Sequence, residues 1–459
     1  MKTVYIITGP IACGKSTLYK YLLEEGIIPN IPFLSNDKFY YESFSGLDIP
    51  TEKKYNLAKR KCKEEINKFI KEEKSFVLEN VCAKDSKLEL INGFKNNGYK
   101  IIIYFISVNN VELTIERSIK REENGYLSIN EKKIHDRYRR SLNNVRKLMD
   151  ISDEMYIYDN SGDTIKKIFE KREGRVQILD VEKYIYKYLN FKKMIKLIAL
   201  DCDGTLLRKD KSISKNTINT IKKLKNQGSS IVLASARPFY RLVKYLRQLD
   251  LLSEGQYTIS FNGSLIINNY TGEEIFSKTF KKKDIDYILD VSLKFNHNVF
   301  LYGKNEIYSN HENYEYKKNN PDVNFNVVDF KTLDFDIVEI YKIVFINSSQ
   351  KISEIKEKVF EELSDKFELS SSIPQYIEIV NKGVTKSNAL EIIGKKLSIS
   401  NKEMVVFGDR DNDISMMNYA GISIAMGNAT DNVKKIASYT TKSNEEDGVS
   451  HALKILFKI

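Results

Sequence analysis

Residues 9–17, GPIACGKST, combine glycines, a lysine and two hydroxyl side chains in the spacing G-x-x-x-x-G-K-[ST]. The glycines allow the backbone to curl so that its N–H groups point at phosphate oxygens. The lysine would reach the terminal phosphates of ATP, and the first hydroxyl would ligate Mg²⁺. The candidate nucleotide-binding residues are Gly9, Gly14, Lys15, Ser16 and Thr17.

Two acidic residues follow this loop at positions that suit phosphoryl transfer. Asp37 comes after a short apolar stretch, where a general base would accept the proton of an acceptor hydroxyl. The alternative interpretation is that Asp37 only caps the helix after it. Glu79 ends a predicted strand, where it would hold Mg²⁺ or the acceptor, or simply be a charge at a strand end.

The segment at 114–145 has helical spacing and is dense in arginine. Arg117 and Arg121 are four residues apart and share one helix face, and Arg137 and Arg140 share another. Guanidinium groups that close over a triphosphate would stabilise the phosphoryl group during transfer. A solvated, charged helix is the alternative interpretation.

The stretch IALDCDGTLL, residues 198–207, indicates a second phosphate chemistry. Asp201 and Asp203 follow an apolar strand on a turn that Gly204 permits. Because residues two apart in an extended chain point the same way, both carboxylates are expected to face one divalent metal ion. Asp201 would be the nucleophile that forms an aspartyl-phosphate, and Asp203 the acid and base that serves the leaving group and water.

Three later motifs supply the other parts of such a site. SIVLASARP (230–238) ends a predicted strand with Ser235, whose hydroxyl can bind a phosphate oxygen. Lys386, at a predicted helix start, offers a cation for the phosphate and for Asp201. VVFGDRDND (405–413) ends a predicted strand with Asp409 and continues to Asp413, both of which could bind the metal ion. The predicted Mg²⁺ ligands of this site are Asp201, Asp203, Asp409 and Asp413.

The elements that must position these residues alternate between strand and helix in both halves of the chain. This alternation predicts an α/β fold with two doubly wound parallel-sheet domains. Residues 163–193 are predicted to form a polar, helix-like tail between the two halves. The predicted strands are 3–8, 74–80, 99–108, 195–201, 230–236 and 337–346, and the predicted helices include 53–73 and 217–228.

Composition limits the class of protein. The chain has 459 residues, 42% hydrophobic and 29% charged, which is typical of a globular protein of two to four domains. We expect no membrane span, because no apolar run is long enough, and no signal peptide. The four cysteines lack metal-ligand spacing, so reduced thiols and a cytoplasmic location are expected.

The first half resembles the zeta-toxin-like family of P-loop kinases. Beyond the phosphate loop and the arginine segment, the similarity includes LENV (78–81) and YDNS (158–161), and it covers most of residues 1–165. The resemblance implies ATP-dependent phosphorylation of a small hydroxyl acceptor, sugar nucleotides being the known case. It implies Asp37 as the base, with Arg117, Arg121 and Arg140 near phosphates. At 124–126 this chain has Asn-Gly-Tyr where many members have Gly-Gly-His, which leaves the acceptor open.

The second half, 195–459, resembles haloacid-dehalogenase-type phosphatases. SFNGSLI (260–266), YAGISIAMGNA (419–429) and SNEEDGVSHAL (443–453) are similar to the Cof-type branch. The resemblance implies a Mg²⁺-dependent phosphatase with a large α/β cap, inserted between the second and third motifs, that selects the substrate and excludes water. Ser235-Ala236 stands where many relatives have Thr-Gly, and serine keeps the hydroxyl.

These observations predict a bifunctional enzyme with ATP and Mg²⁺ as cofactors. It would combine a kinase of a small metabolite or sugar nucleotide with a phosphomonoester hydrolase, without a membrane partner. The expected domains are a P-loop kinase at 1–190, a phosphatase core at 194–274 and 371–459, and a cap at 275–370.

Two other functions stay open from the sequence. Nucleic-acid end repair is favoured by the net charge of +11, because residues 1–193 hold 36 Lys and Arg against 28 Asp and Glu. Tyr126 and Tyr138 among the arginines favour it too, whereas a large cap suits small molecules. A phosphatase with an ATP-gated regulatory module is the other alternative, although every residue that catalysis requires is present.

Overall fold

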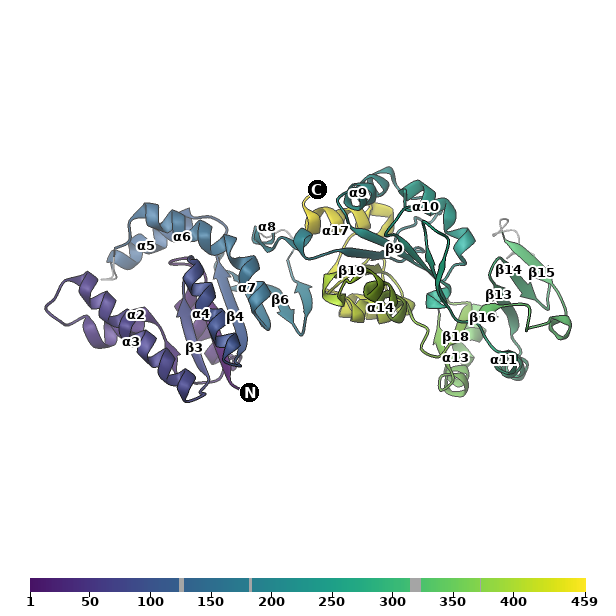
Figure 1. The fold of residues 1–459 in the computed structure, drawn as a ribbon, viewed down its shortest axis with the longest axis horizontal. Coiled ribbons are helices and arrows are strands. Elements are labelled where there is room, and N and C mark those ends of the chain that lie inside the picture. The colour runs from purple at the N-terminus through teal and green to yellow at the C-terminus, as the bar shows by residue number, and fades with distance from the viewer. Residues whose placement is uncertain (124–127, 181–183, 314–322, 372) are drawn as a thin grey trace. The chain divides into compact units, whose positions relative to one another are not determined.

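The computed structural model describes residues 1–123, 128–180, 184–313, 323–371 and 373–459. The chain divides into two compact units, Met1–Asn190 and Phe191–Ile459, each of mixed α/β structure as predicted (Figure 1). Among the helices in these described ranges, none combines the length and the apolar composition that crossing a membrane requires.

The first unit is built on a seven-stranded sheet. Its strands are β1 (Thr3–Thr8), β2 (Phe33–Leu34), β3 (Phe76–Asn80), β4 (Lys100–Ser107), β5 (Glu154–Asp159), β6 (Lys166–Arg172) and β7 (Arg175–Ile178). Its α-helices are α1 (Lys15–Glu24), α2 (Asn36–Phe39), α3 (Thr51–Lys71), α4 (Asp85–Asn96), α5 (Glu112–Glu123), α6 (Glu131–Asn143), α7 (Val145–Ile151) and α8 (Tyr186–Leu189). The strand order is β2-β3-β1-β4-β5-β6-β7, and the first five strands run parallel.

Helices cover both faces of this sheet. Leu18 of α1 packs with Ile7 and Ile102 on one face. On the other face, the ring of Phe94 in α4 lies 5.6 Å from that of Phe76 in β3. The central strands are therefore buried on both sides, which explains their nearly continuous apolar sequences.

The prediction of a helix-like tail at 163–193 is wrong for most of that segment. It forms the antiparallel hairpin β6–β7, and the only described α-helix in this range is α8. Glu173 and Gly174 both have positive φ, 52° and 80°. Such a two-residue turn matches the twist of a hairpin, and it sets Ile168 and Val176 into the interior.

The core of the second unit is an eight-stranded sheet. Its strands are β8 (Leu197–Leu200), β9 (Ser230–Ala234), β10 (Tyr257–Ser260), β11 (Leu265–Asn268), β12 (Glu274–Ser277), β19 (Met404–Gly408), β20 (Ile422–Ala425) and β21 (Tyr439–Thr440). Its α-helices are α9 (Lys215–Asn226), α10 (Val243–Leu249), α14 (Lys386–Leu397), α15 (Ile414–Tyr419), α16 (Asp431–Ile436) and α17 (Gly448–Phe457). The order is β12-β11-β10-β9-β8-β19-β20-β21, so β9, β8 and β19 are adjacent and parallel.

A second sheet lies between β12 and α14 in the sequence, and we name residues 280–381 the inserted domain. Its strands are β13 (Asn298–Gly303), β14 (Glu306–Ser309), β15 (Asn324–Val327), β16 (Ile340–Ile346), β17 (Phe367–Ser370) and β18 (Tyr376–Asn381), and its described α-helices are α11 (Lys282–Lys294) and α13 (Ser349–Leu363). The order is β15-β14-β13-β16-β18-β17. The predicted cap spanned 275–370, but β12 pairs with β11 of the core sheet, and β18 pairs with β16, so the inserted sheet continues to Asn381.

The two faces of the inserted sheet have different partners. Ile285 of α11 and Val359 of α13 pack on one face. On the opposite face, Val344 of β16 packs with Phe261 and Leu265 of the core. The inserted domain therefore contacts the core through the face that its helices leave uncovered.

Candidate active sites

Asp201 lies just beyond the end of β8. Its backbone N–H donates to the carbonyl of Phe407 in β19 at 3.1 Å, and the residue is only 6% exposed. The chain then turns sharply at Gly204, where φ is +85°. A Cβ atom on Gly204 would overlap the carboxylate of Asp409, so both the turn and the close approach require glycine here.

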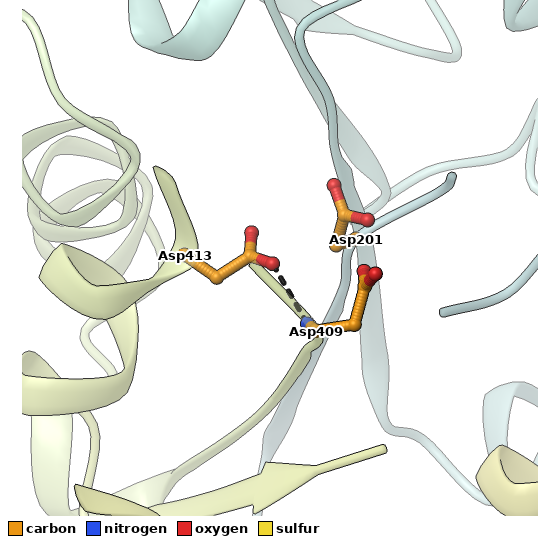
Figure 2. Close-up of side chains that lie close together, drawn as sticks. All are labelled: Asp201, Asp409 and Asp413. Atoms are coloured by element: carbon orange, nitrogen blue, oxygen red, sulfur yellow. Dashed lines mark hydrogen bonds between the residues drawn. The ribbon is translucent and has the colours of Figure 1, made fainter. Parts of the chain in front are cut away.

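Three buried carboxylates face one another at this edge of the sheet (Figure 2). Asp201, Asp409 and Asp413 each offer an oxygen, and these oxygens all lie within 4.8 Å of one another. Asp413 is held by two backbone donors, since its Oδ2 accepts from the N–H of Asp409 at 2.9 Å and of Arg410 at 3.1 Å. This donor set of hard oxygens is what Mg²⁺ prefers.

Lys386 is the first residue of α14 and lies within the same cluster. Its Nζ is 2.6 Å from Oδ1 of Asp201 and 2.7 Å from Oδ1 of Asp413, and its side chain has no exposed surface. The hydroxyl of Thr385 caps the helix by accepting from the N–H of Asn388. The structure thus brings together the lysine and three of the four predicted metal ligands.

The electrostatics of the cluster follow from its charges. Burial raises the pKa of Asp201, and the neighbouring Asp413 raises it further while Lys386 opposes them. Burial and Asp413 also raise the pKa of Asp409 to about 7. One ammonium group against three buried carboxylates leaves an excess of negative charge, so the site favours a divalent cation.

The carboxylate of Asp203 does not join this cluster. Arg237 holds it in a two-pronged ion pair, Nε to Oδ2 at 2.5 Å and Nη2 to Oδ1 at 2.6 Å, and Lys211 lies 2.8 Å from Oδ1. Partial burial raises the pKa of Asp203, but Arg237 and Lys211 outweigh burial and hold this pKa well below its usual range. The prediction that both aspartates face one metal assumed an extended chain, whereas β8 ends before Asp201.

Ser235 lies beyond the end of β9, the neighbour of β8. It is 1% exposed, and its hydroxyl accepts from the N–H of Arg237 at 3.2 Å. The side chains of Ser235, Asp201 and Asp409 therefore come from the carboxyl ends of three adjacent parallel strands. This is the edge where open α/β sheets bind their ligands.

The phosphate loop of the first unit joins β1 to α1 as predicted. Gly9 and Gly14 have φ of 152° and 102°, and a Cβ on Gly14 would overlap the amide of Asn160. That amide donates to the carbonyl of Cys13 at 2.9 Å. Nζ of Lys15 donates to the carbonyl of Pro10 at 2.8 Å, inside the loop. Ser16 and Thr17 lie exposed in the first turn of α1.

Asp37 and Glu79 gather near this loop. Burial raises the pKa of Glu79, whose charged neighbours are Lys15, Asp37 and Arg121 and whose carboxylate pairs with the Ser16 hydroxyl. The hydroxyl that caps α2 belongs to the residue before Asn36, so Asp37 is not the cap. Instead, a carboxylate oxygen of Asp37 accepts from the hydroxyl of Tyr55 at 3.2 Å.

The arginines separate into two groups. Arg117 donates to the backbone carbonyl of Asn160 at 3.0 Å and therefore lies beside the phosphate loop, and Arg121 interacts with Glu79. Arg140 instead pairs with Asp136 on its own helix at 2.9 Å and is half exposed. The structure does not bring Arg140 to the other candidate residues.

Tyr138, one of the two aromatic residues that favour a nucleic-acid surface in the sequence, is partly buried. The hydroxyl of Tyr138 donates to the carbonyl of Val108 at 2.8 Å, which ties this side chain to the domain interior. Tyr126 lies outside the described residues, as does the whole Asn-Gly-Tyr stretch at 124–126 that differs from many members of the zeta-toxin-like family. A stacking platform for bases needs rings that face solvent.

Sequence reasoning missed the partners that orient the predicted residues. Tyr55 contacts Asp37 from α3, and Arg237 and Lys211 contact Asp203. Arg237 lies two residues after Ser235, inside a motif already recognised, so its position was a usable signal. Tyr55 and Lys211 lie in lysine-rich surface-like stretches and carry no such signal.

Comparison with known proteins agrees with the division of the chain into two units. The haloacid dehalogenase-like hydrolase family model matches residues 198–453, and the zeta toxin family model matches residues 1–173. The 5-amino-6-(5-phospho-D-ribitylamino)uracil phosphatases YitU and YcsE of Bacillus subtilis are each 31% identical, over 57% of this chain and over 98% and 95% of their own lengths.

A solved haloacid dehalogenase-like hydrolase from Bacteroides thetaiotaomicron is 28% identical, with a TM-score of 0.52 over 57% of this chain and all of its own. The matches span the core sheet, the inserted domain and all the residues of the acidic cluster. The chain therefore belongs to the haloacid dehalogenase-like hydrolases, as a phosphatase of the Cof type preceded by a zeta-toxin-like, P-loop kinase-like unit.

Proposed function

We propose that this protein is bifunctional, an ATP-dependent kinase of a small hydroxyl acceptor and a Mg²⁺-dependent phosphomonoester hydrolase. The observation that carries the proposal is that each unit gathers groups suited to its own chemistry. The phosphatase cluster combines Asp201 with Lys386 at 2.6 Å, and the kinase-like unit combines its phosphate loop with Asp37 and Glu79.

In the phosphatase reaction, a carboxylate oxygen of Asp201 attacks the phosphorus and the ester oxygen leaves with a proton from Asp203. Water then attacks the phosphorus of the aspartyl-phosphate and gives a proton to Asp203, and the bond to Asp201 breaks, which releases inorganic phosphate and restores the free carboxylate. The Ser235 hydroxyl and Lys386 would hold the phosphoryl oxygens. Asp201, Asp409 and Asp413 would hold Mg²⁺, which when bound neutralises the charge of the phosphoryl group.

Asp203 needs a different environment for the acid step. Its carboxylate is paired with Arg237 and Lys211, which favour its ionised form. A phosphate dianion arriving at the cluster offers Arg237 a competing partner of opposite charge. Loss of the bidentate pair would raise the pKa of Asp203 and allow it to carry the proton.

In the kinase reaction, Asp37 accepts the proton of the acceptor hydroxyl while its oxygen attacks the terminal phosphorus of ATP and ADP leaves. Tyr55 holds the carboxylate of Asp37 through its hydroxyl. Lys15 would leave the Pro10 carbonyl for the phosphates, with Arg117 and Arg121 nearby, and Ser16 would ligate the Mg²⁺ that accompanies ATP.

The substrates are proposed to be small. Curated relatives of the phosphatase unit are phosphatases of 5-amino-6-(5-phospho-D-ribitylamino)uracil, a phosphomonoester on a polyol chain. A sheet-bearing inserted domain suits the enclosure of such a molecule. For the kinase, a metabolite or sugar nucleotide is preferred to a nucleic acid end, because Tyr138 is engaged in the domain interior.

One experiment tests both halves in the full chain. Wild type, Asp201→Asn and Lys15→Ala are assayed for p-nitrophenyl phosphate hydrolysis with Mg²⁺, and for transfer of labelled phosphate from ATP to sugar nucleotides and a 5′-hydroxyl oligonucleotide. We expect Asp201→Asn to abolish only hydrolysis and Lys15→Ala only transfer. Hydrolysis that survives Asp201→Asn contradicts the phosphatase mechanism. ATP binding without transfer to any acceptor would favour a regulatory module.

A further inference from the structure

The inserted domain contains a buried ion pair. Lys342 of β16 and Glu378 of β18 lie 2.8 Å apart, Nζ to Oε1, with side chains only 4% and 2% exposed. Removing two charges from water is expensive, and apolar residues of similar volume often stabilise a protein as well. Stability alone therefore gives no reason for a charged pair at this position.

The pair lies on the face of the inserted sheet that contacts the core. Glu378 is registered opposite Val344, the residue that packs with Phe261 and Leu265. Lys342 is two residues before Val344 on the same strand, with Tyr302 beside it, its Nζ 4.5 Å from the ring centroid. Alternation along β16 places both charges toward the core rather than toward α11 and α13.

Each member of the pair continues into the phosphatase site. Lys342 Nζ donates to the backbone carbonyl of Ala236 at 2.9 Å. Ala236 is the residue between Ser235, the proposed phosphate ligand, and Arg237, which pairs with Asp203. Lys342 of the inserted domain therefore holds the turn that follows β9 in the core through this hydrogen bond.

Glu378 reaches the same turn through one intermediate residue. Its Oε2 accepts from the side-chain amide of Asn262 at 3.0 Å, and the backbone N–H of Asn262 donates to the carbonyl of Ser235 at 3.0 Å. Asn262 has φ of 57°, a left-handed conformation that asparagine tolerates. Two separate routes thus lead from one ion pair to this turn, one to the carbonyl of Ala236 and one to the carbonyl of Ser235.

We propose that Lys342 and Glu378 are positioning residues of the phosphatase, which fix the turn at 235–237 and so complete the phosphate site only when the inserted domain is seated on the core. The inference rests on the phosphatase activity of the second unit. It gives the inserted domain a part in the chemistry that is independent of its contacts with the rest of the substrate.

The test uses p-nitrophenyl phosphate and orthovanadate, a phosphate mimic, on the full chain. The double variant Lys342→Met/Glu378→Leu removes both charges and leaves none unpaired. We expect kcat/KM to fall at least tenfold and the inhibition constant of vanadate to rise at least tenfold, while hydrogen exchange shows β16 still protected. The matched control is Lys294→Met/Glu362→Leu, which removes an exposed pair of the same domain and should leave both constants unchanged.

A folded double variant with wild-type kcat/KM and vanadate inhibition would overturn the proposal, because the pair would then be structural only. If the double variant loses the protection of β16, Asn262→Gly decides. Glycine keeps the left-handed backbone and removes the amide, so vanadate should again bind at least tenfold more weakly, and unchanged binding would overturn the proposal. Asp201→Asn, assayed in parallel, reports separately whether the hydrolysis is that of the proposed mechanism.

Discussion

We expect His297 to make the inserted domain sensitive to acid. The residue precedes β13, is 7% exposed, and stacks on the ring of Phe345 with centroids 5.8 Å apart. Its Nδ1 lies 3.2 Å from the side-chain nitrogen of Asn347, a contact that suits a neutral ring. Burial, with Lys351 nearby, lowers the pKa of His297 from 6.5 to about 4.

The sign and size of the effect follow from this shift. Between pH 6.5 and 4 the unfolded domain binds a proton at His297 and the folded domain does not, so stability falls as the pH falls. Moving from pH 7 to pH 5 should remove about 2 kcal/mol from the free energy of opening of this domain. Below the folded pKa both states are protonated, and the loss levels off.

Hydrogen exchange of the β13 and β16 amides, corrected for intrinsic rates, measures this opening free energy at the two pH values. In His297→Phe the ring can still stack on Phe345, and the acid-dependent loss should shrink by about 2 kcal/mol. His311→Phe, at an exposed histidine of the same domain, is the matched control and should behave as wild type. Equal acid losses in wild type and His297→Phe would refute the reasoning.

Three further predictions concern the active sites. Gly204→Ala should displace Asp409 and so lower phosphatase kcat/KM by about 100-fold. Gly255→Ala is the control, because Gly255 has a similar φ of 75° but open space around it, and it should leave kcat/KM unchanged. Equal losses in the two variants would contradict the role of the close approach. Lys386→Met removes the cation that pairs with two buried carboxylates and should lower the free energy of unfolding of its unit by about 3–5 kcal/mol. Urea denaturation measures this change, and an unchanged midpoint of the transition would refute the prediction. Tyr55→Phe should lower kinase kcat about tenfold by releasing the carboxylate of the base, and an unchanged kcat would remove Tyr55 from the mechanism.

Several of the residues that the sequence could locate lie at the carboxyl ends of parallel strands. Asp201, Ser235 and Asp409 each follow a short apolar run, and the alternation of strands and helices places such ends along one edge. The phosphate loop was predictable for the same reason, because its motif stands between a strand and a helix. Local pattern and topology together were enough for this part of the fold and the site.

Other features depended on contacts that no local pattern encodes. Asp203 turned toward Arg237 because β8 had already ended, so alternation no longer applied to it. Lys342 and Glu378 are 36 residues apart in the sequence. They meet because β16 and β18 are adjacent strands of the inserted sheet, an order that no local pattern reveals. The hairpin β6–β7 was mistaken for helix because its charged residues obscured the alternation and the signal of the Glu173-Gly174 turn.

That hairpin has a practical consequence for separating the two activities. The zeta toxin match ends at residue 173, inside the turn, so a fragment cut there would lose β7. The backbone groups of β6 that pair with β7, from Phe169 to Arg172, would then form a bare sheet edge. Such an edge is a template for pairing with another copy and promotes aggregation. A fragment that ends at Asn190 keeps β6 paired with the short strand β7, which remains the edge strand as in the full chain, and it is the fragment suited to assaying the first unit alone.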